Sequence, residues 1–114
     1  MKRQKRLARR QRADIDVLDI IDHCLVEAPH AAIGFVEALE AAYQHIGRSP
    51  ATGSPRYAHE LNLPGLRCWR CARYPYLVFC MEHEDRIDVW RVLHSGRDMP
   101  VYLQDDGESP QSDG

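Results

Sequence analysis

The residues best suited to chemistry lie in RVLHSGRD, residues 91 to 98, where two arginines, a histidine and an aspartate surround a serine-glycine turn. His94 has Arg91 three residues before it and Arg97 three residues after it. A histidine in such company can act as a general acid or base. Alternatively, its ring bonds to a nearby backbone group or carboxylate, such as that of Asp98, and fixes the end of a strand. Residue types alone favour this second interpretation.

Arginines form the most suggestive group. We expect Arg67, Arg70 and Arg73 to lie on one strand and Arg91 on another, with Arg97 close by, so that some of them share a sheet face. Like charges crowded on a sheet need neutralising acids, and the candidates are Asp88, Asp98, Glu82 and Glu60. The group is therefore either an internal ion-pair network or an anion-binding surface for RNA phosphate or for acidic residues of a protein partner. Periodicity does not choose between the two.

Cys68 and Cys71 have the CxxC spacing of zinc and thiol-disulfide sites. On an extended strand, however, these two positions point to opposite faces, and Cys24 and Cys80 lie on different elements. We therefore predict buried, reduced thiols, with no metal and no cofactor. The remaining histidines show no ligand spacing and are expected to be solvated: His23, His30, His45, His59 and His83.

A chain of 114 residues with 44% hydrophobic residues suits one domain. We expect this domain to span residues 1–104 and the acidic tail, residues 105–114, to be disordered, because its composition cannot form a core. The chain has no apolar run long enough to cross a membrane, and its basic start is not followed by an apolar stretch like that of a signal peptide. We therefore expect a soluble protein of the cytoplasm with no membrane partner.

The net charge of -2 conceals a strong segregation of charge. Residues 1–12 carry seven bases and no acid, whereas residues 105–114 carry four acids and no base. The first segment, KRQKRLARRQR, could bind nucleic acid through a salt-sensitive attraction to phosphate, or it could be a solvated end. Between the two ends every base is an arginine, and the planar arginine side chain suits an interface better than lysine does.

Two helices precede the strands. Residues 14–26 show apolar residues at helical spacing, Ile15, Leu18, Ile21 and Leu25, with Asp16, Asp19 and Asp22 on the other side. Pro29 is placed to begin a second helix, which Gly47 is expected to end. Its inner stripe is Ala32, Phe35, Leu39, Ala42 or Tyr43, and Ile46. Residues 48–56 follow as an exposed loop.

Three short segments rich in aromatic and β-branched residues, 66–73, 76–82 and 86–94, predict antiparallel strands joined by tight turns. Residues 2–9 are a weaker candidate for another strand. The middle segment is apolar on both faces, so the helices must pack on one face and something else must shield part of the other. A partner chain is one candidate for that cover.

These elements, in this order, resemble the RelE/ParE superfamily of toxins from bacterial type II toxin-antitoxin systems. The resemblance rests on ADIDVLDIIDHC, on a helix opened by AP and followed by GRSPATGSPR, and then on LPGLR, YPYLVF and the closing RVLHSGRD, over residues 7 to 100. The closing motif is similar to that of the ParE branch. Cys80 departs from the pattern, since many relatives have a tyrosine there, and the basic N-terminal run is heavier than usual.

The resemblance implies an α+β fold, with a helical hairpin packed on a small, curved, mainly antiparallel sheet of three to four strands that recruits residues 2–9. It also implies neutralisation by a cognate antitoxin, whose C-terminal segment is disordered when free and wraps around the toxin. Toxin and antitoxin would then form a hetero-oligomer. We expect the contacts to the target or antitoxin to come from Arg67, Arg70, Arg73, Arg91, His94, Arg97 and Asp98.

Two activities divide the superfamily. RelE-type members cut mRNA on the ribosome, and here Arg67, Arg91 and Arg97 would stabilise charge while His94 moves the proton. ParE-type members lack such a catalytic set and bind DNA gyrase. No tyrosine follows His94 closely, since Tyr102 is eight residues later, which favours a ParE-like binder of gyrase. A RelE-type mRNA endonuclease and an inactive partner of the antitoxin remain as alternatives.

Overall fold

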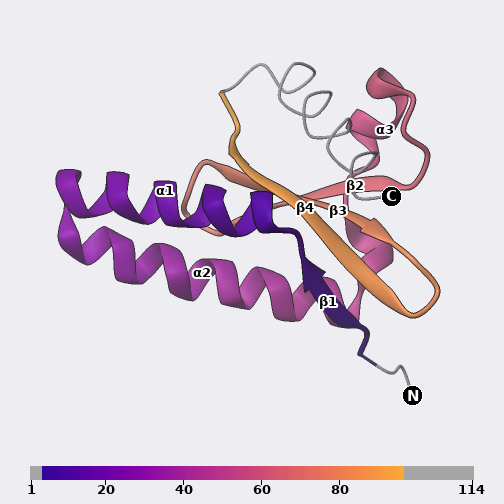
Figure 1. Cartoon of the computed structure of the whole chain (residues 1–114), viewed down its shortest axis with the longest axis horizontal. Helices are drawn as coiled ribbons and strands as arrows, with labels where there is room; N and C mark the ends of the chain where they lie inside the picture. Colours follow the sequence, from indigo (N-terminus) through magenta and orange to yellow (C-terminus); the bar gives the residue numbers. More distant parts are fainter. Residues whose placement is uncertain (1–3, 97–114) are drawn as a thin grey trace.

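A computed structural model describes residues 4–96 of the chain. Two long helices, α1 (Gln11–Glu27) and α2 (Pro29–Arg48), form an antiparallel hairpin beside a four-stranded sheet (Figure 1). The strands are β1 (Arg6–Arg9), β2 (Leu66–Arg70), β3 (Tyr76–Glu82) and β4 (Arg86–His94), in the order β1-β4-β3-β2. A short 3-10 turn, η1 (Pro50–Thr52), and a third helix, α3 (Arg56–Leu61), connect the hairpin to the sheet. The predicted α+β fold is thus confirmed.

The strand predictions hold with one correction. β3 and β4 have the predicted bounds, and their antiparallel pairing follows from the tight HEDR turn. β2 is shorter than predicted and ends at Arg70, because the chain turns there and Arg73 takes a left-handed backbone conformation with φ of 74°. Arg73 therefore lies in the turn before β3, and its expected place on a strand was wrong.

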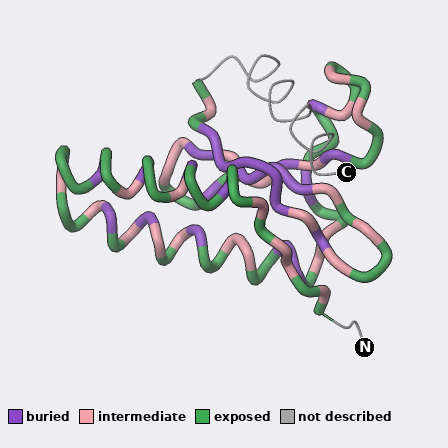
Figure 2. The backbone as a smooth tube through the Cα atoms, viewed as in Figure 1, coloured by how far each residue is buried: buried purple, intermediate pink, exposed green. Residues whose placement is uncertain are grey.

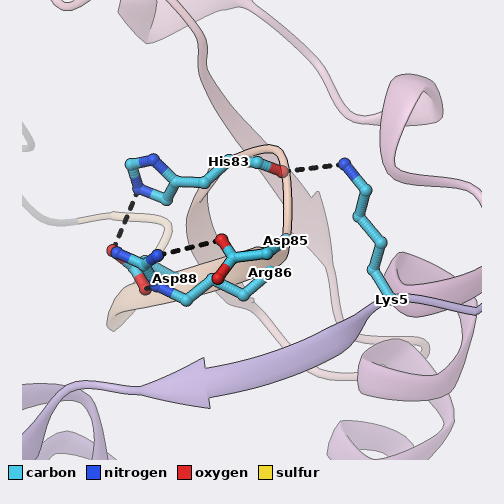
Figure 3. A network of polar contacts seen from close by, with 5 residues as sticks. All are labelled: Lys5, His83, Asp85, Arg86 and Asp88. Atoms are coloured by element: carbon cyan, nitrogen blue, oxygen red, sulfur yellow. Dashed lines mark hydrogen bonds and ion pairs between the residues drawn. The ribbon is translucent and has the colours of Figure 1, made fainter.

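β1 confirms the predicted N-terminal strand, although it covers only part of residues 2–9. It lies parallel to the first half of β4, with Arg6 opposite Arg86 and Arg9 opposite Val89. Lys5, just before it, donates a 2.7 Å hydrogen bond to the carboxylate of Glu82. It also donates a 2.7 Å hydrogen bond to the backbone carbonyl of His83 (Figure 3).

Ion pairs stabilise the β3–β4 turn to which Lys5 binds. The carboxylate of Asp88 is 3.0 Å from His83 Nε2 and accepts a hydrogen bond from Arg86 Nε, and Arg86 also bonds Asp85 (Figure 3). His83 is therefore engaged with a carboxylate, in contrast to its predicted solvated role.

α2 packs as predicted, with Ala32, Phe35, Leu39 and Ile46 all buried against the sheet. It runs one residue past the expected stop, and Gly47 serves a different purpose. A Cβ added at Gly47 would lie 3.0 Å from the side-chain nitrogen of Gln4, so glycine allows the N-terminal segment to approach the helix closely.

α1 is rotated relative to the sequence prediction, which is therefore wrong about its inner face. Its buried residues are Ala13, Asp16, Ile20 and Cys24. Leu18, which was expected to face the core, is 61% exposed, and Ile15 and Leu25 are also exposed. At about 100° per residue, these three lie on the side of the helix opposite to the buried one. The helix thus carries a second apolar stripe that the chain itself leaves in solvent.

The opposite face of the sheet carries a second core made by this chain. Tyr57 of α3 packs edge-to-face on Phe79 of β3, with ring centroids 5.4 Å apart. Leu66, Cys68, Trp90 and Leu93 complete the buried cluster. In Figure 2 the buried positions, in purple, gather along the sheet. The sequence required some cover on this face, for which a partner chain was one candidate, and α3 of the same chain supplies part of it. No helix in the described residues is long and apolar enough to span a membrane.

Candidate functional site

A cleft of about 320 Å³ lies between α1 and the second half of β4. It exists because β1 pairs with β4 only as far as Val89, after which the chain leaves the sheet edge to begin α1. The lining residues come from α1, β3 and β4: Arg12, Asp16, Asp19, Ile20, His23, Tyr76, Arg91, Val92, Leu93 and His94.

Two of the lining residues, Asp16 and Arg91, bind each other. One carboxylate oxygen of Asp16 accepts a 2.7 Å hydrogen bond from Arg91 Nε, and the other accepts a 2.9 Å bond from Arg91 Nη2. The backbone N–H of Val92 donates to the same carboxylate at 3.1 Å. Asp16 thus ties α1 to the strand edge that β1 leaves uncovered, which is a bidentate, charge-assisted arrangement.

Burial makes this pair different from every other ion pair in the described residues. The side chains of Arg91 and Asp16 are 3% and 9% exposed. Sequence reasoning placed Arg91 at the site but missed Asp16, which it assigned to the polar face of the helix. The first interpretation of the arginines, an internal ion pair, therefore holds for Arg91.

His94 ends β4 with its ring exposed. Its Nδ1 accepts a 2.9 Å hydrogen bond from the backbone N–H of Gly96, and its ring packs edge-to-face on Tyr76 with centroids 5.4 Å apart. Because Nδ1 accepts, the neutral ring carries its proton on Nε2. The predicted bond to a backbone group that fixes the strand end is therefore present.

The other predicted site residues do not join the cleft. Arg67, on the far edge strand β2, donates a 2.7 Å hydrogen bond to the carbonyl of Gly53 in the connection before α3, and Arg70 is exposed at the end of β2. Arg73 is exposed in the following turn. Arg97, Asp98 and the acidic tail lie outside the described residues, and so does Tyr102. The described part of the chain therefore brings together Arg91 and His94 alone among the predicted set.

All four cysteines are buried free thiols, as predicted. Cys68 and Cys71 belong to the cores on opposite faces of the sheet, as their spacing on an extended strand predicted. No group of three potential metal ligands is found among the described residues. Burial raises the pKa of Cys71 to about 11 and also raises the pKa of Cys80, so these thiols stay protonated at neutral pH.

The raised thiol pKa values predict alkaline destabilisation. Between the unfolded pKa of 9.0 and the folded pKa of about 11 for Cys71, the unfolded chain binds fewer protons than the folded one. The free energy of unfolding should therefore be independent of this thiol below pH 9.0 and fall as the pH rises toward about 11. Urea midpoints measured across this range check it, and Cys71→Ala should show a shallower fall. Equal slopes in the two proteins would contradict the assignment.

Comparisons with known proteins agree with this fold. A family model described as ParE toxin of the type II toxin-antitoxin system, parDE, matches residues 7–99. The chain belongs to the ParE toxin family. The match includes all the strands and helices described above, except the first residue of β1, and extends over the closing motif. No curated protein sequence matches the chain.

The fold of this ParE family member is similar to that of a solved structure described as the chromosomal ParDE TA system from P. aeruginosa. The TM-score is 0.67 at 20% sequence identity, over 80% of this chain and 96% of the other. At this identity the likeness concerns the fold. The family match and the shared fold together confirm the predicted ParE branch.

Proposed function

We propose that this toxin arrests growth by binding a protein target stoichiometrically, that the target is DNA gyrase, and that a cognate antitoxin neutralises it. The observation that carries the proposal is the buried ion pair between Arg91 and Asp16. A nuclease of the RelE type would need this guanidinium to stabilise charge on a phosphate, but its fork already holds the carboxylate of Asp16. A phosphate could reach Arg91 only after a buried ion pair had been broken.

The position of Arg67 supports the same conclusion. It belongs to β2, and β3 lies between β2 and β4, so Arg67 does not line the cleft that contains His94. His94 is held at the strand end by Gly96 and Tyr76, which suits a residue that braces and displays the end of β4. The motif at residues 91–98 is then part of a binding surface.

The solvent-facing stripe of α1 supports an antitoxin-binding role. Its residues Ile15, Leu18 and Leu25 are 38%, 61% and 49% exposed. Near the closed end of the hairpin, Val26 at the end of α1 and Ile33 on α2 are 84% and 66% exposed. This end projects beyond the sheet (Figure 1). Large apolar side chains gathered on one element mark interaction surfaces. An amphipathic segment that is disordered when free could fold on this stripe.

Expression without antitoxin tests the target. We expect growth arrest accompanied by DNA breaks and the SOS response while mRNA remains intact, together with inhibition of purified gyrase in a supercoiling assay. Ala in place of His94 should leave this toxicity largely intact, because the residue braces a strand end. Early mRNA fragments, or loss of toxicity in His94→Ala with fold and antitoxin binding preserved, would favour the endonuclease. Normal growth would favour an inactive antitoxin partner.

A further inference from the structure

The helical hairpin differs from the rest of the chain in its charge. Residues 13–47 contain seven acidic residues and no lysine or arginine. One of the seven, Asp16, is buried in its pair with Arg91. The other six are exposed: Asp14, Asp19, Asp22, Glu27, Glu37 and Glu40. The hairpin that projects beyond the sheet is therefore acidic along its length (Figure 1).

The acids of α1 lie on the same side of the helix as its exposed apolar residues. At about 100° per residue, Leu18 and Ile15 lie on either side of Asp22. Asp19 borders this stripe beyond Ile15, and Asp14 borders it on the other side. Negative charge thus lies within the outer apolar stripe of α1 and along both of its edges.

Most of these acids lack a counter-charge in the described part of the chain. Asp14 pairs with Arg9, but Asp19 and Asp22 make no ion pair with the described residues at salt-bridge distance. They are three residues apart on one helix, where like charges repel each other. Glu27 ends α1 in a turn that contains no base, so its carboxylate lies at the negative end of the helix dipole. Positive charge from a partner would offset all of these unfavourable interactions.

The combination of carboxylates and apolar side chains limits what can bind here. Nucleic acid and anionic membrane surfaces carry the same sign of charge as the stripe and would be repelled. A second copy of the chain, packed on this face about a two-fold axis, would bring like charges together. A helix with an apolar face between rows of lysine or arginine matches both the charge and the exposed leucines.

On the basis of the antitoxin-binding role proposed above, we propose that the antitoxin segment bound by this stripe is a cationic amphipathic helix. Its apolar residues, three and four positions apart, pack on Ile15, Leu18 and Leu25. Lysines or arginines beside them pair with Asp19 and Asp22. From Ile15 to Leu25 the stripe is about 15 Å long, which a helix of about three turns covers.

The test measures binding of the full-length cognate antitoxin to the immobilised full-length toxin by surface plasmon resonance over a range of salt concentrations. We expect the Kd to rise with salt, because exposed ion pairs are screened. D19N/D22N keeps the size of both side chains and should weaken binding about fivefold at low salt, mainly through slower association. Its Kd should also depend less on salt than that of the wild type.

The matched control is E60Q/E84Q, which removes the same charge from exposed positions of α3 and of the β3–β4 turn. It should change the Kd less than about twofold. Equal weakening by the two double variants would overturn the proposal, because the effect would then come from the net charge of the toxin. D19N/D22N should not lower the melting temperature, since it removes a repulsion within α1.

Leu18→Asp distinguishes failure of this proposal from failure of the antitoxin-binding role. If Leu18→Asp abolishes binding but D19N/D22N binds like the wild type at every salt concentration, the stripe binds the antitoxin through a segment that is not cationic. If neither variant changes the affinity, the antitoxin binds elsewhere and both proposals are wrong.

Limited digestion of the complex with subtilisin, followed by mass spectrometry, identifies the antitoxin segment itself. The segment that the wild-type toxin protects, and that Leu18→Asp leaves open to cleavage, should contain more lysine and arginine than aspartate and glutamate. A protected segment with net negative charge would overturn the proposal.

Discussion

Asp16→Ala is expected to destabilise the toxin by about 3 to 5 kcal/mol, because it leaves the Arg91 guanidinium buried without a counter-charge. It also removes the acceptor of the Val92 N–H at the open edge of β4. A domain of this size has a free energy of unfolding of about 5 to 15 kcal/mol, so the variant should be marginally folded. Urea unfolding followed by circular dichroism measures the loss.

The control is the double variant Asp16→Leu/Arg91→Met, which replaces both charges with apolar side chains. Because desolvation offsets much of the attraction in a buried pair, this variant should recover most of the stability lost in Asp16→Ala. Asp14→Ala removes another carboxylate of the same helix. Because the ion pair of Asp14 with Arg9 is half-exposed, this change should lower the free energy of unfolding by under about 1 kcal/mol. If Asp14→Ala and Asp16→Ala lowered the free energy of unfolding equally, the buried pair would contribute no more to stability than the exposed one.

Leu18→Asp is expected to abolish neutralisation by the antitoxin while leaving the toxin folded. The side chain is 61% exposed in the free chain, so the change should alter the free energy of unfolding by about 0.5 kcal/mol or less. In an apolar interface, a buried carboxylate costs about 2 to 4 kcal/mol of binding energy, or about 30- to 1,000-fold in Kd. Calorimetric titration with the cognate antitoxin, and growth on co-expression, provide the measurements.

Ala51→Asp adds the same charge at an exposed position of η1, which follows the end of α2 opposite to the closed end of the hairpin, and should be neutralised normally. Undiminished affinity for Leu18→Asp would show that the outer stripe of α1 is not where the antitoxin binds. A Leu18→Asp toxin that has lost its melting transition would instead indicate that the residue supports the fold.

Local sequence determined much of the fold. The bounds of β3 and β4 follow from short apolar runs between turn residues, and Pro29 fixes the start of α2 because its ring suits the first turn of a helix. The buried stripe of α2 follows from its 3.6-residue period. The order of these elements was also sufficient to recognise the toxin family. The bounds of the elements and their order can be read from the sequence without knowing which distant residues are in contact.

Helix α3 was not predicted from the sequence, because its local signals are short. It has only six residues, and its cues are Tyr57 and Leu61 at helical spacing after Pro55. Asn62 ends it in a left-handed conformation with φ of 55°, which asparagine tolerates better than most residues. A segment of this length is stabilised by packing on the sheet and has little tendency to form alone.

Only the tertiary structure decided how α1 is oriented and therefore what the chain leaves exposed. The helix carries apolar residues on two sides, and periodicity favours the side with Leu18 and Leu25. Asp16 selects the other side because it meets Arg91, 75 residues later in the chain. The energy of a buried ion pair depends on both partners and on their shared exclusion from water, so neither residue's sequence neighbourhood reveals it. The same contact occupies Arg91 and turns the outer stripe of α1 toward solvent.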